Sequence, residues 1–474
     1  MFKLVSRTPS PVHGRATMRW TPVSRAATLA VMCLSTSWTG MARAENLMDL
    51  YVAAKGYDAT YLSAKAQAES VQYQVEQAHA LFRPALNLQG SVTRSHYDSD
   101  VSVPPIYQQF LGVNSYNANV TSKKLALQAR QSIYNASDSA KVDQAEQSMV
   151  VAQADLKTAE DDLAARLAQA YFDVLAAQDV LTTTQANQKA LAEQLASAKR
   201  SFEVGNATIT DTREAQARYD LAAAQEIAAT NDLHIKRITL DQLVGRNDVK
   251  PQPLIAPTDL NGLASGEMED WVTKAQDAPT IRKATAALDV ARLEIDKAKA
   301  GHLPTVAAVA SVQQVDADSA SDSARQSAGA GTTSAIGVEL NMPLYSGGSV
   351  QNRVKEVLKL EEKAERDLDN AKRSVALATR QAYSVLQSGL AQVKALEAAE
   401  ASAKLALEAT QLGYRVGVRI NKDVLDAQTA LASTQKDLYK ARYDVIVASV
   451  KLKQVTGVLR PEDLTELNKM IVQP

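Results

Sequence analysis

The strongest constraint on how this chain folds is an internal repeat: its two halves have related sequences. Residues Phe202–Gly205, with the sequence FEVG, recur 212 positions later as Tyr414–Gly417, with the sequence YRVG. At the same offset Asp211 coincides with Asp423, and no gap is needed between the two matches. Self-similarity at a fixed spacing indicates that one supersecondary unit is built twice. The chain is therefore expected to contain two equivalent halves.

Composition sets the bounds of these halves. We predict a first repeat over residues 45–250 and a second over residues 267–460. The linker between them, residues 251–266, is rich in proline, which is typical of connections because proline interrupts helices and sheet ladders. Residues 461–474 remain as a C-terminal segment.

Residues 1–44 have the composition of a secretory signal peptide. Six Lys or Arg and no Asp or Glu accompany an apolar stretch, and Ala42-Arg43-Ala44 supplies the small residues of a cleavage site. Cys33, the only cysteine, lies inside this segment, so the exported chain would hold no disulfide. Without this segment the chain is net acidic, which argues against nucleic acid as a partner.

Each half contains a long helix. From Ser349 onward, small or apolar residues recur at alternating steps of three and four, which is a heptad seam. The equivalent segment of the first half is residues 136–201. About 65 residues at about 1.5 Å each give a rod on the order of 100 Å. Because many seam positions are alanine and bury little area, such rods need several neighbours, and we expect an oligomer.

Shorter helices flank each rod. A second helix is predicted after a turn, over residues 211–244 in the first half and 423–456 in the second. A further helix opens each half, near residues 46–82 and 268–300. The sequence therefore predicts a mainly helical protein built from antiparallel helix pairs.

Between the opening helix and the rod, the hydrophobic period changes from about 3.6 to 2. Ile336, Val338 and Leu340 alternate with small or polar residues. We predict one β-hairpin in each half, at about residues 85–134 and 305–345. Strands of roughly 10 residues with one apolar face match those of an outer-membrane barrel. Two hairpins cannot close a barrel, whereas three copies of the chain would supply twelve strands.

Other interpretations stay open at this point. The hairpins could cap a soluble bundle, and a periplasmic adaptor or a coiled-coil scaffold would also contain long helical hairpins. Enzymatic function is not expected, because no nucleophile elbow, zinc-protease, P-loop or dinucleotide motif occurs. The histidines outside the leader lack metal-binding spacing, so no metal or other cofactor is predicted. They are His79, His96, His234 and His302.

Five motifs in order resemble the TolC family of trimeric outer-membrane efflux and secretion channels, along essentially the whole chain after the leader. They are ENLM at 45–48, AYFDVL at 170–175, GHLP at 301–304, PLYSGG at 343–348 and DVLDA at 423–427. The resemblance implies a mainly α-helical fold with membrane β-hairpins. In that fold a homotrimer forms a twelve-stranded outer-membrane β-barrel that continues into a long periplasmic α-helical barrel.

The same resemblance implies a function. The chain would be a passive exit duct through the outer membrane, with a gate at its periplasmic end. An inner-membrane transporter and a periplasmic adaptor protein would hand over the substrates and engage the gate. Drug efflux and type I protein secretion fit this expectation equally well.

Site residues are carried over from the family one at a time. Arg419 and Tyr414 match gate positions on the second helix turn, and Thr210 and Asp211 match their partners on the first. A bond from arginine to aspartate can be bidentate and would hold the coils closed. Asp423 and Asp426 match the family's selectivity rings. They would form two rings of carboxylates around a threefold axis, and such rings filter cations.

Each of these assignments has a structural alternative. Spacing alone favours helix capping for Asp423-x-x-Asp426, and Asp211-x-x-Glu214 resembles a capping box. Gly205 and Gly417 are expected to supply turn conformations that other residues resist. Lys422 places a cation beside the predicted ring, which would weaken cation selectivity if it faced the pore.

Overall fold

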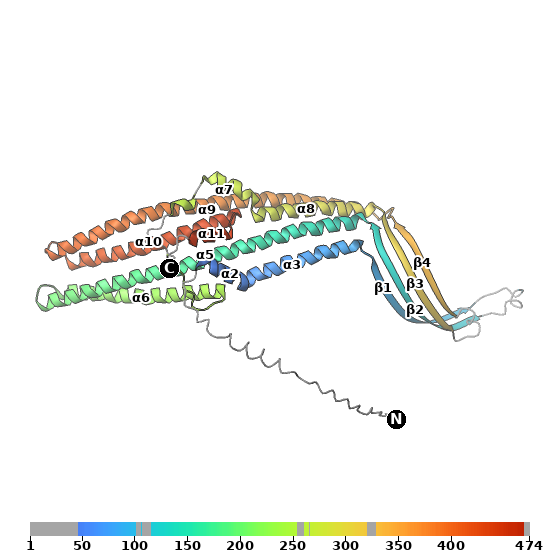
Figure 1. The fold of residues 1–474 in the computed structure, drawn as a ribbon, viewed down its shortest axis with the longest axis horizontal. Coiled ribbons are helices and arrows are strands. Elements are labelled where there is room, and N and C mark those ends of the chain that lie inside the picture. The colour runs from blue at the N-terminus through green and yellow to red at the C-terminus, as the bar shows by residue number, and fades with distance from the viewer. Residues whose placement is uncertain are drawn as a thin grey trace, which may run out of the picture. The chain divides into compact units, whose positions relative to one another are not determined.

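The computed structural model describes residues 46–100, 106, 115–253, 260–264, 266–319 and 329–468. Along them one order of elements occurs twice: helical segments, two antiparallel strands, a long helix and a second helix (Figure 1). The predicted signal peptide, parts of the predicted linker, the hairpin loops and the last six residues lie outside this range.

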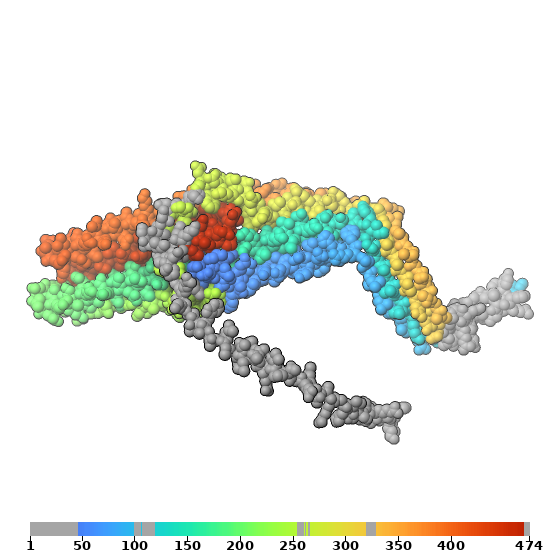
Figure 2. Space-filling view, viewed as in Figure 1, coloured from blue at the N-terminus to red at the C-terminus, as the bar shows by residue number. Residues whose placement is uncertain are grey.

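Two helical hairpins make up most of the fold. α5 (Ala136–Glu203) pairs with α6 (Ile209–Val244), and α9 (Ser349–Arg415) pairs with α10 (Asn421–Thr456). The two long helices predicted over residues 136–201 and from Ser349 onward coincide with α5 and α9. The two hairpins lie side by side through α5 and α10, and their turns lie at the same end, far from the strands (Figures 1 and 2).

The helix that opens the first half is not continuous, so the prediction of a single helix was wrong there. It is divided into α2 (Leu47–Tyr57) and α3 (Ala59–His79). At the break, the Asp58 carboxylate accepts a bond of 2.8 Å from the backbone N–H of Tyr61 and so caps α3. Arg166 of α5 donates two further bonds to the same carboxylate, at 3.0 and 3.1 Å. A tertiary ion pair therefore fixes the break.

The opening helix of the second half is also divided, into α7 (Met268–Lys274) and α8 (Pro279–Lys299). Here the cause is local, because Pro279 occupies the first turn of α8, the helix position that tolerates proline. The remaining helical elements are short. They are the 3₁₀ turns η1 (Ala80–Phe82), η2 (Asn261–Ala264), η3 (Ala275–Asp277) and η4 (Ala300–His302), and the helix α11 (Pro461–Asn468).

The four strands form one antiparallel sheet in the order β1-β2-β3-β4. The strands are β1 (Ala85–Asp100), β2 (Ser115–Tyr134), β3 (Thr305–Ser319) and β4 (Gly329–Asn341). They have 13 to 20 residues and are longer than predicted. β4 ends at Asn341, before the predicted end near residue 345, because Pro343 has no N–H to give to a ladder.

One face of this sheet is apolar and open to the surroundings. Leu86 pairs with Ala129, Ala129 with Ala310, and Ala310 with Ile336, so an apolar row crosses all four strands. The side chain of Ile336 is 90% exposed. A soluble protein would seldom leave such a row uncovered, because exposed apolar patches mark interaction surfaces.

The opposite face is more polar, and both edges of the sheet are free. Arg130 of β2 reaches across β3 to Glu339 of β4, with 2.6 Å between Nη1 and Oε2. Among the described residues, β1 pairs only with β2, and β4 only with β3. Each edge therefore presents a long row of backbone groups that a further strand can pair with.

The largest apolar core lies around the middle of α5, where α2, α10 and α11 pack. Its centre is Tyr171, whose hydroxyl accepts a bond of 2.9 Å from the backbone N–H of Gln252 and donates one of 3.2 Å to the carbonyl of Gln252. Tyr383, its equivalent in the second half, donates to the carbonyl of Gly266 at 3.1 Å. Two equivalent tyrosines thus hold the two ends of the segment 252–266.

Within the described part of the chain, no helix has both the length and the apolar character needed to cross a membrane. The same residues contain no cluster of three or more His, Cys, Asp or Glu arranged to hold a metal ion.

Candidate functional site

The turns that join the paired helices have the same backbone geometry in both halves. Gly205 and Gly417 adopt φ angles of +79° and +80°. The N–H of Asn206 bonds to the carbonyl of Ser201 at 2.8 Å, and the N–H of Val418 to the carbonyl of Gly413 at 2.9 Å. These bonds close the C-terminus of a helix over a left-handed residue, a conformation that glycine adopts at least cost.

On the first turn, Asp211 is the third residue of α6 and bonds back to the N-cap residue, Thr208. Its carboxylate accepts from the backbone N–H and the hydroxyl of Thr208, at 3.0 and 2.8 Å, and its own N–H donates to that hydroxyl at 3.2 Å. This is a reciprocal capping box, which begins three residues earlier than the sequence suggested. Thr210 is exposed beside it.

On the second turn, Arg419 pairs with the start of the helix that follows it. Its Nη1 lies 3.5 Å from Oδ2 of Asp423, which stands in the first turn of α10. α10 begins after Ile420 with no side-chain cap, so Asp423 stands in its first turn and is not the capping residue. Tyr414 is partly buried at the end of α9. No ion pair between Arg419 and Asp211 occurs among the residues that the structure describes.

Asp426 contacts two cations, one of which the sequence did not reveal. Lys422 Nζ lies 2.5 Å from Oδ2, and Nη2 of Arg218 lies 2.6 Å from Oδ1. The hydrogen bond from Lys422 lowers the pKa of the Asp426 carboxyl, and the charge of Arg218 acts in the same direction. Arg218 is 208 positions away on α6, and no local pattern links it to Asp426.

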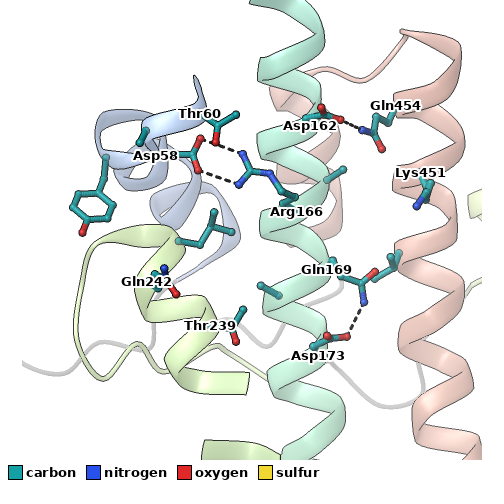
Figure 3. A pocket seen from close by; sticks show the side chains of 16 residues that line it. Asp58, Thr60, Asp162, Arg166, Gln169, Asp173, Thr239, Gln242, Lys451 and Gln454 are labelled. Carbon is teal, nitrogen blue, oxygen red and sulfur yellow. Dashed lines mark hydrogen bonds and ion pairs between the residues drawn. The ribbon is translucent and has the colours of Figure 1, made fainter. Parts of the chain in front are cut away.

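A second polar site lies near the middle of the helices. A groove of about 1020 Å³ is bounded by the α2–α3 break, α5, the end of α6 and α10 (Figure 3). Arg166 binds Asp58 across it and lowers the pKa of that carboxyl through its hydrogen bonds. Gln454 of α10 donates to Asp162 of α5 farther along the groove.

The family model described as outer membrane efflux protein matches residues 50–246 and 273–458. The chain belongs to the outer membrane efflux protein family. The two matched segments together span most of the chain, and each contains one helical hairpin and one pair of strands.

Two members of this family show the extent of the similarity. The outer membrane protein TolC of Vibrio cholerae is 31% identical over 427 residues, covering 90% of this chain and 93% of the relative. The outer membrane protein TolC of Escherichia coli strain K12 is 29% identical over 447 residues, covering 92% of this chain and 87% of the relative.

A solved structure gives the fold independently. The crystal structure of the outer membrane protein VceC from Vibrio cholerae matches with a TM-score of 0.70 over 87% of this chain and 96% of that chain. At 18% identity this match shows the fold alone.

Membership of the outer membrane efflux protein family makes the chain an outer-membrane channel for efflux or secretion. It does not favour the alternatives of a periplasmic adaptor or a coiled-coil scaffold. The relatives are channel proteins, and both matched segments include the strands as well as the helices.

Proposed function

We propose that three copies of this chain form a twelve-stranded barrel in the outer membrane that continues into an α-helical barrel across the periplasm. The observation that carries this proposal is the open sheet. It has an apolar outer face and two unpaired edges, and four strands are too few to close a barrel. Pairing β4 of one copy with β1 of the next removes every edge. Each copy contributes two repeats, which we propose to span residues 45–250 and 267–460.

The helices support the same assembly. α6 packs mainly on α5, and α9 mainly on α10 and α8, so α6 and α9 stand at the two sides of the helical layer. Both carry exposed apolar side chains at helical spacing, and a neighbouring copy would cover them. These residues are Ile227, Ile235 and Ile238 on α6, and Leu377, Val385 and Leu405 on α9.

We place the periplasmic gate at the two helix turns, with Arg419, Tyr414, Thr210 and Asp211 as its residues. Because α9 and α6 lie on opposite sides of one copy, the second turn of one copy meets the first turn of the next in the closed ring. The Arg419 to Asp211 tie is then a contact between subunits. This placement agrees with Arg419 pairing only locally, with Asp423, inside a single chain.

Asp423 and Asp426 are the residues that we propose for the cation-selectivity rings, with three copies of each around the pore axis. A periplasmic adaptor protein and an inner-membrane transporter would engage the helical end and open the gate. Relatives bear names from both toluene efflux and alkaline protease secretion, and the channel itself is proposed to be passive toward its cargo, whether drug or secreted protein.

The mass of the purified protein in detergent tests this assembly. Light scattering with a correction for bound detergent should give three chains per particle, and outer-membrane fractions should contain the protein. A monomer or dimer at all protein concentrations would refute the closed barrel, because neither supplies twelve strands.

A further inference from the structure

Asp426 is the centre of a cluster of charges that joins the two helical hairpins. It accepts from Lys422 on its own helix and from Arg218 on α6, at 2.5 and 2.6 Å. The hydrogen bond to Asp426 raises the pKa of Lys422, and the negative charge of Glu214, one turn before Arg218, adds to this effect. Two cations and two carboxylates thus gather where α6 faces the first turns of α10.

The contacts around this cluster fix the start of α10 to the first hairpin. Leu425 is fully buried among side chains that include Leu191 and Ala215. Gln194 of α5 donates a bond of 2.7 Å to the amide oxygen of Asn421, whose side chain is also buried. The residues just before α10, by contrast, are exposed. At this end of the molecule the hairpins are therefore joined at the first two turns of α10, just beyond the exposed turn residues.

The duplication shows which members of this cluster belong to the repeat. At the offset of 212 residues, Asp426 is the equivalent of Glu214, so both acids recur. Arg218 has alanine, Ala430, as its equivalent, and Lys422 has threonine, Thr210. Neither cation is thus dictated by the repeat, and the bond from Arg218 to Asp426 is a feature that the repeat alone does not supply.

We propose that Arg218 holds Asp426 as a latch between the two hairpins of each subunit, and that opening the channel breaks this bond and leaves Asp426 facing the pore with Lys422 of its own helix as its remaining partner. The proposal rests on the channel function proposed above and assigns Arg218 as an additional gate residue. Gating and cation selection are then coupled through one side chain. In the closed state two cations surround Asp426, and in the open state Asp426 has lost Arg218 and adds more negative charge to the rings.

Single-channel recordings of the full exported chain in planar lipid bilayers test the latch. We expect Arg218→Gln to raise the open probability about threefold to tenfold, as expected when a partly exposed ion pair is lost in each of three subunits. It should also move the reversal potential under a KCl gradient toward the potassium value. Lys422→Gln should move the reversal potential in the same direction but change the open probability less, because Lys422 lies on the helix of Asp426 and does not join the hairpins. Asp426→Asn should raise the open probability equally but move the reversal potential away from the potassium value.

Two further variants serve as controls. Arg213→Gln removes the same charge from the same helix, and Arg213 is exposed and forms no ion pair among the described residues. It should behave as wild type. Arg218→Lys retains a cation near Asp426, so its open probability should stay close to that of wild type. The mass of every variant in detergent confirms that it assembles.

The outcomes separate the latch from the channel. Absence of any conductance from the wild-type protein would refute the channel function and the latch with it. A conducting wild type with an unchanged Arg218→Gln variant would overturn the latch alone. So would equal effects of Arg218→Gln and Arg213→Gln, because the effect would then reflect general charge rather than the contact with Asp426.

Discussion

Arg419 Nη1 lies 3.5 Å from Oδ2 of Asp423 on the same polypeptide, at the start of α10, and not against Asp211. The Asp211 carboxylate accepts hydrogen bonds from Thr208, with which it forms the capping box of α6. A gate that closes a ring of subunits would be incomplete in one chain, since half of each tie belongs to the neighbouring copy. The local pairing of both residues is what a single subunit of such a ring should show.

Arg419→Ala should raise the open-channel conductance and the open probability of the assembled protein. The change removes the cation that we propose to bind Asp211 of the neighbouring copy, so the ring loses three ties at once. Recordings in planar bilayers measure this directly. Arg415→Ala, which removes an exposed arginine from the same turn region, is the matched control and should have little effect. Equal conductance of the Arg419→Ala and wild-type channels would remove Arg419 from the gate.

Gly457→Ala should destabilise the fold more than Gly417→Ala. Both glycines have positive φ angles, which cost about 1–2 kcal/mol for alanine. A Cβ at Gly457 would also lie 2.4 Å from Cδ of Pro279 and 2.9 Å from the Cα of Ala278, whereas nothing lies within 4 Å at Gly417. We expect a total of about 2–4 kcal/mol at Gly457. Thermal unfolding of both variants in detergent gives the comparison, and equal losses would argue against the close packing at Gly457.

Tyr171→Phe should lower the free energy of unfolding by about 1–3 kcal/mol, because the buried backbone N–H and carbonyl of Gln252 lose their two hydrogen bonds with the tyrosine hydroxyl. Tyr383→Phe is its equivalent in the second half and is the natural control. Its hydroxyl bonds to a carbonyl in an exposed setting, so we expect a loss of well under about 1 kcal/mol. If thermal unfolding ranked the two variants in the opposite order, the bonds from Tyr171 would not be the main support of the segment 252–266.

Glu294 should give the junction of α5, α8 and α9 a stability that depends on pH. Burial alone would raise its pKa, but hydrogen bonds from Gln144, Lys297 and Arg353 outweigh burial and lower the pKa to about 2. A carboxyl with a lowered pKa in the folded state stabilises that state above its ordinary pKa of 4.5, and this contribution disappears as the pH falls toward about 2.

Glu294→Gln tests that dependence. The variant should be less stable than wild type by about 1–2 kcal/mol near pH 7, a value reduced for solvent screening of a partly exposed group. The difference should shrink as the pH falls from about 4.5 to about 2. Thermal unfolding curves of both proteins across this range provide the measurement. A difference that stays constant with pH would show that the lost contacts, and not the charge, matter at this position.

The long-range periodicity of the sequence predicted the helical hairpins and the sheet, because heptad spacing and strict alternation persist over many residues. The offset of 212 residues also brought the two turns into equivalence. Breaks within the opening helices were missed for different reasons. Pro279 is a visible local signal, whereas the break at Asp58 depends on Arg166, which lies 108 positions away on α5. Helix propensity depends on neighbouring residues and cannot predict this distant ion pair.

The candidate site was predictable in part only. The resemblance to the TolC family suggested the turn residues as a gate, which stays a prediction, and a capping pattern near Asp211 was visible in the sequence. The true cap, Thr208, lies three residues earlier, and spacing alone did not decide between these positions. The partner of Asp426 was beyond sequence reasoning, because Arg218 belongs to another hairpin and meets it only when α6 and α10 pack together.

We propose that this chain forms a gated, cation-selective channel through the outer membrane. The most direct test is the conductance of the purified protein, residues 45–474, across a planar lipid bilayer under a salt gradient. We expect small, discrete, cation-selective steps, with a selectivity that falls when Asp423 and Asp426 are replaced by asparagine. A protein that never inserts from any detergent preparation, or inserts without cation selectivity, would contradict this proposal.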